Sequence, residues 1–208
     1  MDIKMMNNLS YGLFVLTAKG VKDNGCITNT AMQVTVDPNR IVIAVNKQNY
    51  THDLIIDSGV FNISIIDESA KFDLFKRFGF SSGRDTDKFA NFNDFKRADN
   101  GVVYITNGVN SVISAKVVST TDLGTHTLFL ADVTDAFKVS DNASATYAYY
   151  HKNIKPKPEV IVQAVENAVN STPEYRCTIC GYVQKGEFPQ NFTCPWCRHP
   201  KEDFEQIK

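Results

Sequence analysis

The sequence predicts a mainly β chain in two parts, an N-terminal barrel followed by a small cysteine-rich domain. Short runs rich in Val, Ile, Phe and Thr recur between Gly, Asn and Asp residues over the first 150 or so positions, which is typical of strands joined by turns. Many short strands in one domain favour a closed or partly closed barrel. Four of the five cysteines then crowd the end of the chain.

Seven runs have the composition of strands, and several alternate between apolar and polar residues. They are Tyr11–Thr17, Met32–Val36, Ile41–Val45, Val60–Ile66, Val102–Ile105, Val112–Val118 and Thr125–Val133.

Two helices are expected to interrupt the strands. The first spans Thr51–Asp57, with Thr51 as its capping residue and Gly59 just past its end. The second spans Ser69–Phe78, where phenylalanines spaced three apart predict one buried face.

The domain boundaries follow changes in composition. We expect one domain over 1–152, a linker over 153–173 and a small domain over 174–208. The linker begins with a Lys- and Pro-rich stretch and continues with a short apolar-periodic segment, Val160–Val169, which predicts a helix.

The overall charge argues against nucleic acid as a partner. Lys and Arg number 22 and Asp and Glu 23, whereas nucleic-acid binders usually carry a basic surplus. No run approaches the roughly 20 apolar residues that span a bilayer, so no membrane association is expected. The short apolar run from Tyr11 to Ala18 is interpreted as a strand and not a signal peptide, which predicts a cytoplasmic chain.

The clustered cysteines predict a metal site. They form two Cys-x-x-Cys pairs, Cys177 with Cys180 and Cys194 with Cys197. Two such turns facing each other make a tetrahedral cage of four thiolates, which suits either zinc or iron. A domain of about 35 residues buries too little apolar surface to fold alone, so the metal would supply much of its folding energy.

The residues around these cysteines resemble those of rubredoxins. The segments are Cys177-Thr-Ile-Cys180-Gly-Tyr and Cys194-Pro-Trp-Cys197-Arg, and the short loop between them is similar to the rubredoxin domain of rubrerythrins. The resemblance implies one iron held by Cys177, Cys180, Cys194 and Cys197 that carries one electron at a time. Arg198 stands where rubredoxins commonly have Gly, which puts one amide–sulfur hydrogen bond in doubt.

A second candidate site lies before the first predicted helix. The polar segment Val45–Thr51 leads into that helix, and free amides at a helix N-terminus beside a lysine suit a phosphate group. An ordinary capped helix with a solvated lysine explains the same pattern. Spacing alone does not separate the two.

The order of segments in this domain resembles the flavin reductase-like family, which has an FMN-binding split barrel of Greek-key type. The matching parts are Gly25 to Thr30 before a strand that ends in Asp-Pro, the polar segment that opens a helix, the strand Gly59–Ile66 and the late Gly124-Thr-His126. The resemblance implies that Asn29 and Thr30 lie beside the isoalloxazine. It also implies that the FMN phosphate is held by Lys47, Asn49 and Thr51.

Further residues follow from the same resemblance. The loop 80–89, with Gly83, Arg84 and Lys88, is expected to close over the flavin, or else to be a plain surface loop. His126 is expected to approach the flavin or the nicotinamide as the candidate catalytic residue, or else to be a structural strand histidine. Cys26 is interpreted as a buried, unreactive thiol.

Together the two resemblances imply an electron-transfer enzyme and a homodimer. NAD(P)H would reduce FMN, FMN would reduce the iron, and the iron would serve a partner such as a flavodiiron protein or another protein that reduces oxygen, nitric oxide or peroxide. One alternative is a flavin reductase that releases reduced flavin and carries a structural zinc ribbon. The other is a non-enzymatic chain whose zinc ribbon docks onto protein or nucleic acid.

Overall fold

The chain forms two compact units, residues 1–155 and 156–208. The structure is a computed structural model. The structure describes residues 3–156, 173–178, 182–194 and 200–207. The linker helix predicted over Val160–Val169 lies outside these ranges.

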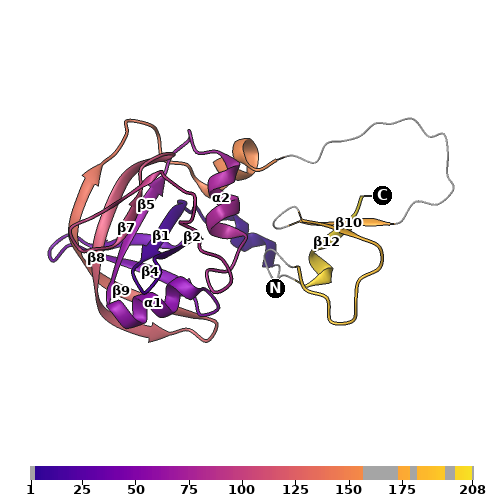
Figure 1. Cartoon of the computed structure of the whole chain (residues 1–208), viewed down its shortest axis with the longest axis horizontal. Helices are drawn as coiled ribbons and strands as arrows, with labels where there is room; N and C mark the ends of the chain where they lie inside the picture. The colour runs from indigo at the N-terminus through magenta and orange to yellow at the C-terminus, as the bar shows by residue number, and fades with distance from the viewer. Residues whose placement is uncertain (1–2, 157–172, 179–181, 195–199, 208) are drawn as a thin grey trace. The chain divides into compact units, whose positions relative to one another are not determined.

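Unit 1 is built on a strongly curled antiparallel sheet of seven strands in the order β2-β1-β5-β8-β9-β4-β3 (Figure 1). Strands β6 and β7 pair with each other as a separate two-stranded sheet. The prediction of a mainly β fold is therefore confirmed. The strands are β1 (Phe14–Ala18), β2 (Asn24–Thr28), β3 (Ala31–Thr35), β4 (Arg40–Asn46), β5 (Val60–Ile66), β6 (Phe95–Arg97), β7 (Val103–Ile105), β8 (Val109–Asp122) and β9 (His126–Lys138).

Alternation along the strands separates the inside of the barrel from its outside. On β4 the residues Ile41, Ile43 and Val45 are buried, whereas their neighbours are half-buried. The buried set packs with Phe61 and Phe129, both fully inaccessible. Complete burial of such side chains contributes about 1.5–3 kcal/mol each, so this interior stabilises the barrel.

The strand predictions differ from the structure mainly at β2 and the β8–β9 hairpin. β2 pairs with β1 in the register Leu16↔Cys26, although the run Asn24–Thr28 has few strand-favouring residues. β8 and β9 extend well past the predicted ends, because the two strands satisfy each other's backbone groups as one long hairpin.

Helix α1 spans Tyr50–Ser58, so the predicted helix is confirmed. Gly59 ends it in the left-handed region, with φ of 67°, and donates its N–H to the Ile55 carbonyl oxygen. The expectation that Thr51 caps the helix is wrong. Asn49 occupies the cap position, and Thr51 lies in the first turn and is fully buried.

Helix α2 spans Phe72–Gly79 and begins three residues later than predicted. The preceding Ser69 is engaged in a turn, since Asp67 accepts hydrogen bonds from both its N–H and its hydroxyl. Phe75 and Phe78 are buried as expected, and Phe72 is half-buried. The short elements of unit 1 are η1 (Ile3–Asn8), α3 (Tyr147–Tyr149) and η2 (Tyr150–Ile154). None of the helices in the described ranges is both long and apolar enough to cross a bilayer.

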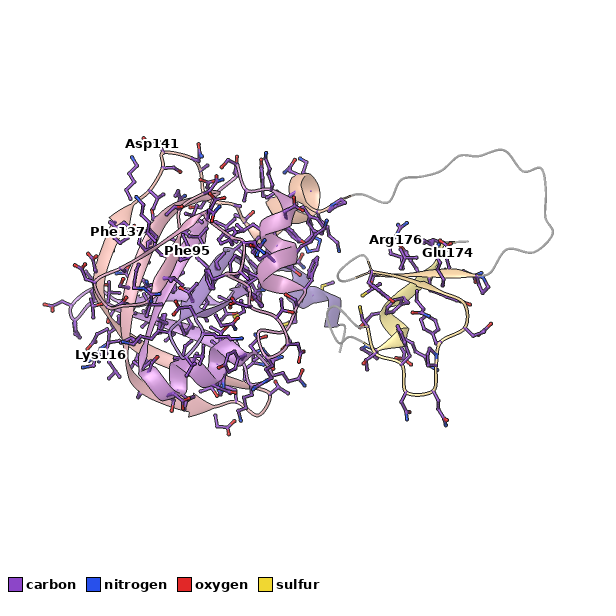
Figure 2. All side chains as sticks on the ribbon, in the orientation of Figure 1. Phe95, Lys116, Phe137, Asp141, Glu174 and Arg176 are labelled. Carbon is purple, nitrogen blue, oxygen red and sulfur yellow. The ribbon has the colours of Figure 1, made fainter. Side chains whose placement is uncertain are left out.

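Unit 2 contains a three-stranded sheet in the order β11-β10-β12. Its elements are β10 (Glu174–Cys177), β11 (Val183–Lys185), η3 (Lys201–Asp203) and β12 (Phe204–Gln206). Aromatic rings pack beside the sheet, with Phe188 4.6 Å from Tyr175 and 5.3 Å from Phe204 between ring centroids. Figure 2 shows Glu174 and Arg176 on the same side of β10.

Candidate functional site

A cleft of about 290 Å³ opens on unit 1 where the β2–β3 turn meets the ends of β4 and β9. Its lining combines polar groups, which are amides, hydroxyls and an imidazole, with aliphatic and aromatic groups. The lining residues are Leu13, Ile27, Thr28, Asn29, Thr30, Ala44, Val45, Asn46, Asn49, His126 and Tyr147.

Four of the residues singled out from the sequence, Asn29, Thr30, Asn49 and His126, meet in this cleft. Asn29 and Thr30 form the turn between β2 and β3, and Asn49 precedes α1. His126 arrives from β9, where it pairs directly with Asn46 at the end of β4. The sheet register therefore brings together segments almost a hundred residues apart.

Hydrogen bonds orient several of these groups. Thr30 donates its hydroxyl to Asn29 Oδ1 at 3.0 Å, and Gln48 donates its N–H to Asn46 Oδ1 at 2.9 Å. The His126 Nδ1 lies 2.9 Å from the Thr125 hydroxyl oxygen. Hydrogen-bonding contacts within the protein therefore orient Asn29, Asn46 and His126 in the cleft.

Lys47 is engaged outside the cleft. Its Nζ lies 2.6 Å from Asp122 Oδ1 at the tip of the β8–β9 hairpin. The hydrogen bond from Lys47, together with that from the Gly124 N–H, holds the pKa of Asp122 below its usual value. Both side chains reach solvent, so this ion pair contributes little to stability.

Thr51 and Lys88 do not fit the roles expected of them, because both face the interior. Thr51 has no exposed surface, and its hydroxyl accepts a hydrogen bond from Asn24 Nδ2 at 2.9 Å. Lys88 is only 4% exposed and donates to the carbonyl oxygens of Gly25 and Phe78 at 2.9 and 3.1 Å. Burial lowers the pKa of this lysine. Neither side chain reaches a ligand in this arrangement.

Cys26 is buried near Lys88 and Thr51, as the sequence interpretation expected. Burial raises the pKa of its thiol, and this outweighs the opposing effects of the Lys88 charge and the Thr51 hydrogen bond. A protonated, inaccessible thiol is a poor nucleophile, so Cys26 has a packing role.

The loop 80–89 is fastened to α1. The Arg84 guanidinium lies 2.6 Å from Asp53 Oδ2 and over the ring of Tyr50. Burial raises the pKa of Asp53, but hydrogen bonds from His52 and Arg84 outweigh it and lower that pKa overall. Gly83 is required where it stands, because a Cβ there would lie 2.2 Å from Asn24 Oδ1. The contacts of Arg84 with Asp53 and Tyr50 place its guanidinium at the first turn of α1.

The sequence interpretation missed three polar or aromatic lining residues, Thr28, Asn46 and Tyr147. Asn46 lies inside the polar segment already considered, and its pairing with His126 could be found only from the strand register. Tyr147 follows the barrel strands, and its backbone N–H donates to the Tyr11 carbonyl oxygen at 2.9 Å. No local motif marks it as a cleft residue.

The cleft fits a flavin by its chemistry. Isoalloxazine is planar, with an apolar dimethylbenzene end and a polar pyrimidine end rich in hydrogen-bonding atoms. The lining of the cleft includes apolar side chains, among them Leu13 and Ile27, and amides, among them Asn29 and Asn46. Such a combination of apolar walls with a few placed polar groups is typical of cofactor sites.

The cysteine-rich unit fits a thiolate-bound metal. Cys177 ends β10 and Cys194 lies in the loop before η3, and both are buried, at 1% and 0% exposure. The Cys177 N–H donates to the Tyr182 carbonyl oxygen at 2.8 Å, which closes a turn. Cys180 and Cys197 lie outside the described residues. Soft thiolates in a small aromatic unit suit iron or zinc.

The curled barrel with its cleft, joined to a cysteine-rich unit, defines a split-barrel chain with an appended cysteine-rich module. This chain belongs to the flavin reductase-like family. The model of the "Flavin reductase like domain" matches residues 6–157, and that of the "Rubrerythrin, rubredoxin-like domain" matches residues 175–205. Both resemblances seen in the sequence are therefore confirmed.

Two relatives are similar over long stretches. The chain is 36% identical over 230 aligned positions to a "High molecular weight rubredoxin" of Moorella thermoacetica, which covers all of both chains. It is also 36% identical over 158 positions to a "Ferric-chelate reductase (NAD(P)H)" of Archaeoglobus fulgidus, covering 76% of this chain and 93% of the relative.

Solved structures share the fold at lower identity. An NADH:FAD oxidoreductase of Streptomyces globisporus matches with a TM-score of 0.63 and 19% identity, covering 69% of this chain and 84% of that one. A flavoredoxin of Methanosarcina acetivorans matches with a TM-score of 0.55 and 22% identity, covering 66% and 75%.

Proposed function

We propose that this chain is an NAD(P)H-dependent oxidoreductase that uses FMN in unit 1 and an iron centre in unit 2 to deliver electrons singly to a protein acceptor. The observation that carries the proposal is the presence of an amphipathic cleft and a buried cysteine site on one polypeptide. The relative from Moorella thermoacetica is named as a rubredoxin, which supports the electron-transfer part of the proposal. The relative from Archaeoglobus fulgidus is named as a ferric-chelate reductase (NAD(P)H), which supports the reductase part. The proposed acceptor is a flavodiiron protein or another protein that reduces oxygen, nitric oxide or peroxide.

In this proposal the cleft residues bind and orient the flavin. Asn29, Thr30 and Asn46 offer amides and a hydroxyl to its polar end, and Thr125 fixes the ring of His126 beside it. Bound FMN supplies hydride acceptance and release of electrons one at a time. The protein itself needs no acid or base beyond these orienting groups.

The phosphate of FMN is assigned to the start of α1. The free N–H groups of its first turn favour an anion, and Asn49 lies at that turn within the cleft lining. Lys47 and Arg84 flank the turn, each now paired with an exposed or half-exposed carboxylate. We propose that these two cations exchange their carboxylate partners for the phosphate.

In unit 2 the four thiolates of Cys177, Cys180, Cys194 and Cys197 would hold the iron. The aromatic rings of Tyr175, Phe188 and Phe204 pack together within this unit. Linking two centres on one chain raises the effective concentration of acceptor near donor.

Rapid mixing with NADH or NADPH tests the proposal. We expect the flavin absorbance to bleach first and the red ferric-thiolate absorbance to bleach afterwards, at a rate independent of protein concentration. An iron centre that stays oxidised while the flavin is reduced would contradict the relay. A colourless, zinc-loaded unit 2 with continued flavin reduction would instead favour the alternative of a reductase that releases reduced flavin.

We also propose a homodimer formed through the outer face of β3, β4 and β9. Met32, Val42 and Leu130 are directly opposite one another across these strands and form an apolar row, with Met32 63% exposed. Ala44 and Asn46 continue the same face of β4 into the cleft. A second copy on this row would therefore border the flavin site.

Sedimentation velocity tests the dimer. We expect the wild-type chain to sediment as a dimer and Met32→Lys to sediment as a monomer, because a charge in the centre of an apolar contact is left without a partner. The matched control is Val21→Lys, which places the same charge at an exposed apolar position away from this face. This variant should stay dimeric. A monomeric wild-type protein with FMN bound would rule out the dimer.

A further inference from the structure

Tyr147 is a cleft residue to which the proposed function gives no part. It supplies the only phenol ring among the residues that line the cleft, and 38% of its surface is exposed. Tyr side chains are commonly buried only in part. A partly exposed tyrosine in the lining of the cleft is available for contact with a ligand.

Three other rings pack against the ring of Tyr147. Its centroid lies 4.5 Å from that of His151 and 6.4 Å from that of Tyr11, both edge-on, and 6.4 Å from that of Tyr150. The backbone is fixed by the bond to Tyr11 and by the turn of α3, which Thr146 caps. A ring already held in place loses little conformational entropy when a ligand packs on it.

The neighbours of Tyr147 decide which part of a ligand it meets. Its backbone bond to Tyr11 and the bridge between Thr146 and Gly12 put it beside the segment that leads to Leu13, an apolar lining residue, and Ile27 is a further apolar residue of the lining. Aromatic side chains pack favourably on planar rings, with a gain beyond the area that they bury. A planar heteroaromatic ring system is therefore a better occupant of this wall than a flexible aliphatic one.

We propose that Tyr147 is a flavin-contacting residue whose ring packs against the isoalloxazine, and that His151 is a positioning residue that holds Tyr147 in place. This inference rests on the proposed function and adds to it the aromatic wall of the cofactor site. Burial raises the pKa of Tyr147, which favours the neutral phenol.

Chemical protection in the wild-type chain tests the contact without any variant. Nitration with tetranitromethane, followed by peptide mass analysis, should modify Tyr147 in the flavin-free protein. Saturating FMN should reduce that modification at least fivefold. Tyr104 packs on Phe137 away from the cleft and should be nitrated equally with and without FMN. Equal nitration of Tyr147 in both states would overturn the inference.

Variants then measure the size of the effect. We expect Tyr147→Leu to weaken FMN binding about tenfold and to relieve the quenching of flavin fluorescence, because a phenol in contact with isoalloxazine quenches it. Tyr147→Phe should keep most of the affinity. Tyr104→Leu is the matched control and should bind FMN like wild type. Unchanged affinity and quenching in Tyr147→Leu would overturn the inference.

His151 has its own test. His151→Leu should weaken FMN binding several-fold and His151→Phe should restore it, since a ring at this position keeps the edge-on contact. Equal binding by both would refute the positioning role. If wild-type protein fails to bind FMN at all, the proposed function falls together with this inference. If wild type and Tyr147→Leu bind FMN equally, the inference alone is wrong.

Discussion

Replacing Cys177 by serine is expected to empty the metal site and to unfold unit 2, while unit 1 keeps its fold and its flavin. Cys177 is 1% exposed and ends β10, where it pairs with Phe204 of β12. A serine hydroxyl is a hard and weakly acidic ligand that does not replace a soft thiolate. Structural metal sites in such small units contribute on the order of 10 kcal/mol to folding, so the unit has little else to hold it.

Metal analysis and limited proteolysis measure this outcome. We expect about one iron per chain in the wild type and almost none in Cys177→Ser, with new cleavage sites within 173–207. Cys26→Ser is the matched control, because Cys26 is equally buried but lies in β2 of the barrel. It should keep its iron. A Cys177→Ser protein with full iron content would show that Cys177 is not a ligand.

The sequence could predict those parts of the fold that depend on local pattern. Alternation in Ile41–Val45 and the Gly59 helix end both appear in the structure, because they reflect backbone geometry that neighbouring residues determine. β2 was missed because its residues have weak strand propensity, and its pairing with β1 overrides that preference.

Some residues of the candidate site could be predicted from the sequence, and others could not. Asn29, Thr30, Asn49 and His126, which line the cleft, were predicted because the order of segments resembles the flavin reductase-like family, and no local motif alone identified them. Lys88 was misplaced, since a buried lysine held by two carbonyl oxygens is indistinguishable in sequence from a solvated one. Its two acceptors are Gly25 of β2 and Phe78 of α2, which lie 63 and 10 residues earlier in the chain and are brought to it by tertiary packing.

Asp67→Ala is expected to lower the free energy of unfolding by about 3 kcal/mol, because it removes a buried carboxylate that accepts several charge-assisted hydrogen bonds. Asp67 is 1% exposed and accepts from the Ser69 N–H and hydroxyl, the Ser140 hydroxyl and the Asn142 amide, at 2.5–3.1 Å. These bonds join the end of β5 to the segment that follows β9. That segment leads on to Tyr147, so flavin binding should weaken as well.

The same carboxylate makes stability depend on pH. Burial by itself raises the pKa of Asp67, but the hydrogen bonds from Ser69, Asn142 and Ser140 outweigh it and lower that pKa. A carboxyl group whose pKa is lower in the folded chain stabilises the fold above its unfolded pKa of about 3.9, and this contribution is lost as the pH falls through the folded value. The difference in stability between wild type and Asp67→Asn should therefore shrink below about pH 4.

Urea unfolding of unit 1, followed by far-ultraviolet circular dichroism at several pH values from 7 down to 3, measures both effects. Asp141→Asn is the matched control on the same segment, because Asp141 is exposed and pairs only with Lys138 among the described ion pairs (Figure 2). It should remain close to wild type at every pH, since surface ion pairs contribute little. An Asp67→Asn protein as stable as wild type at pH 7 would show that the buried charge does not hold the β5 end, and a constant gap down to pH 3 would show that its pKa is not lowered by folding.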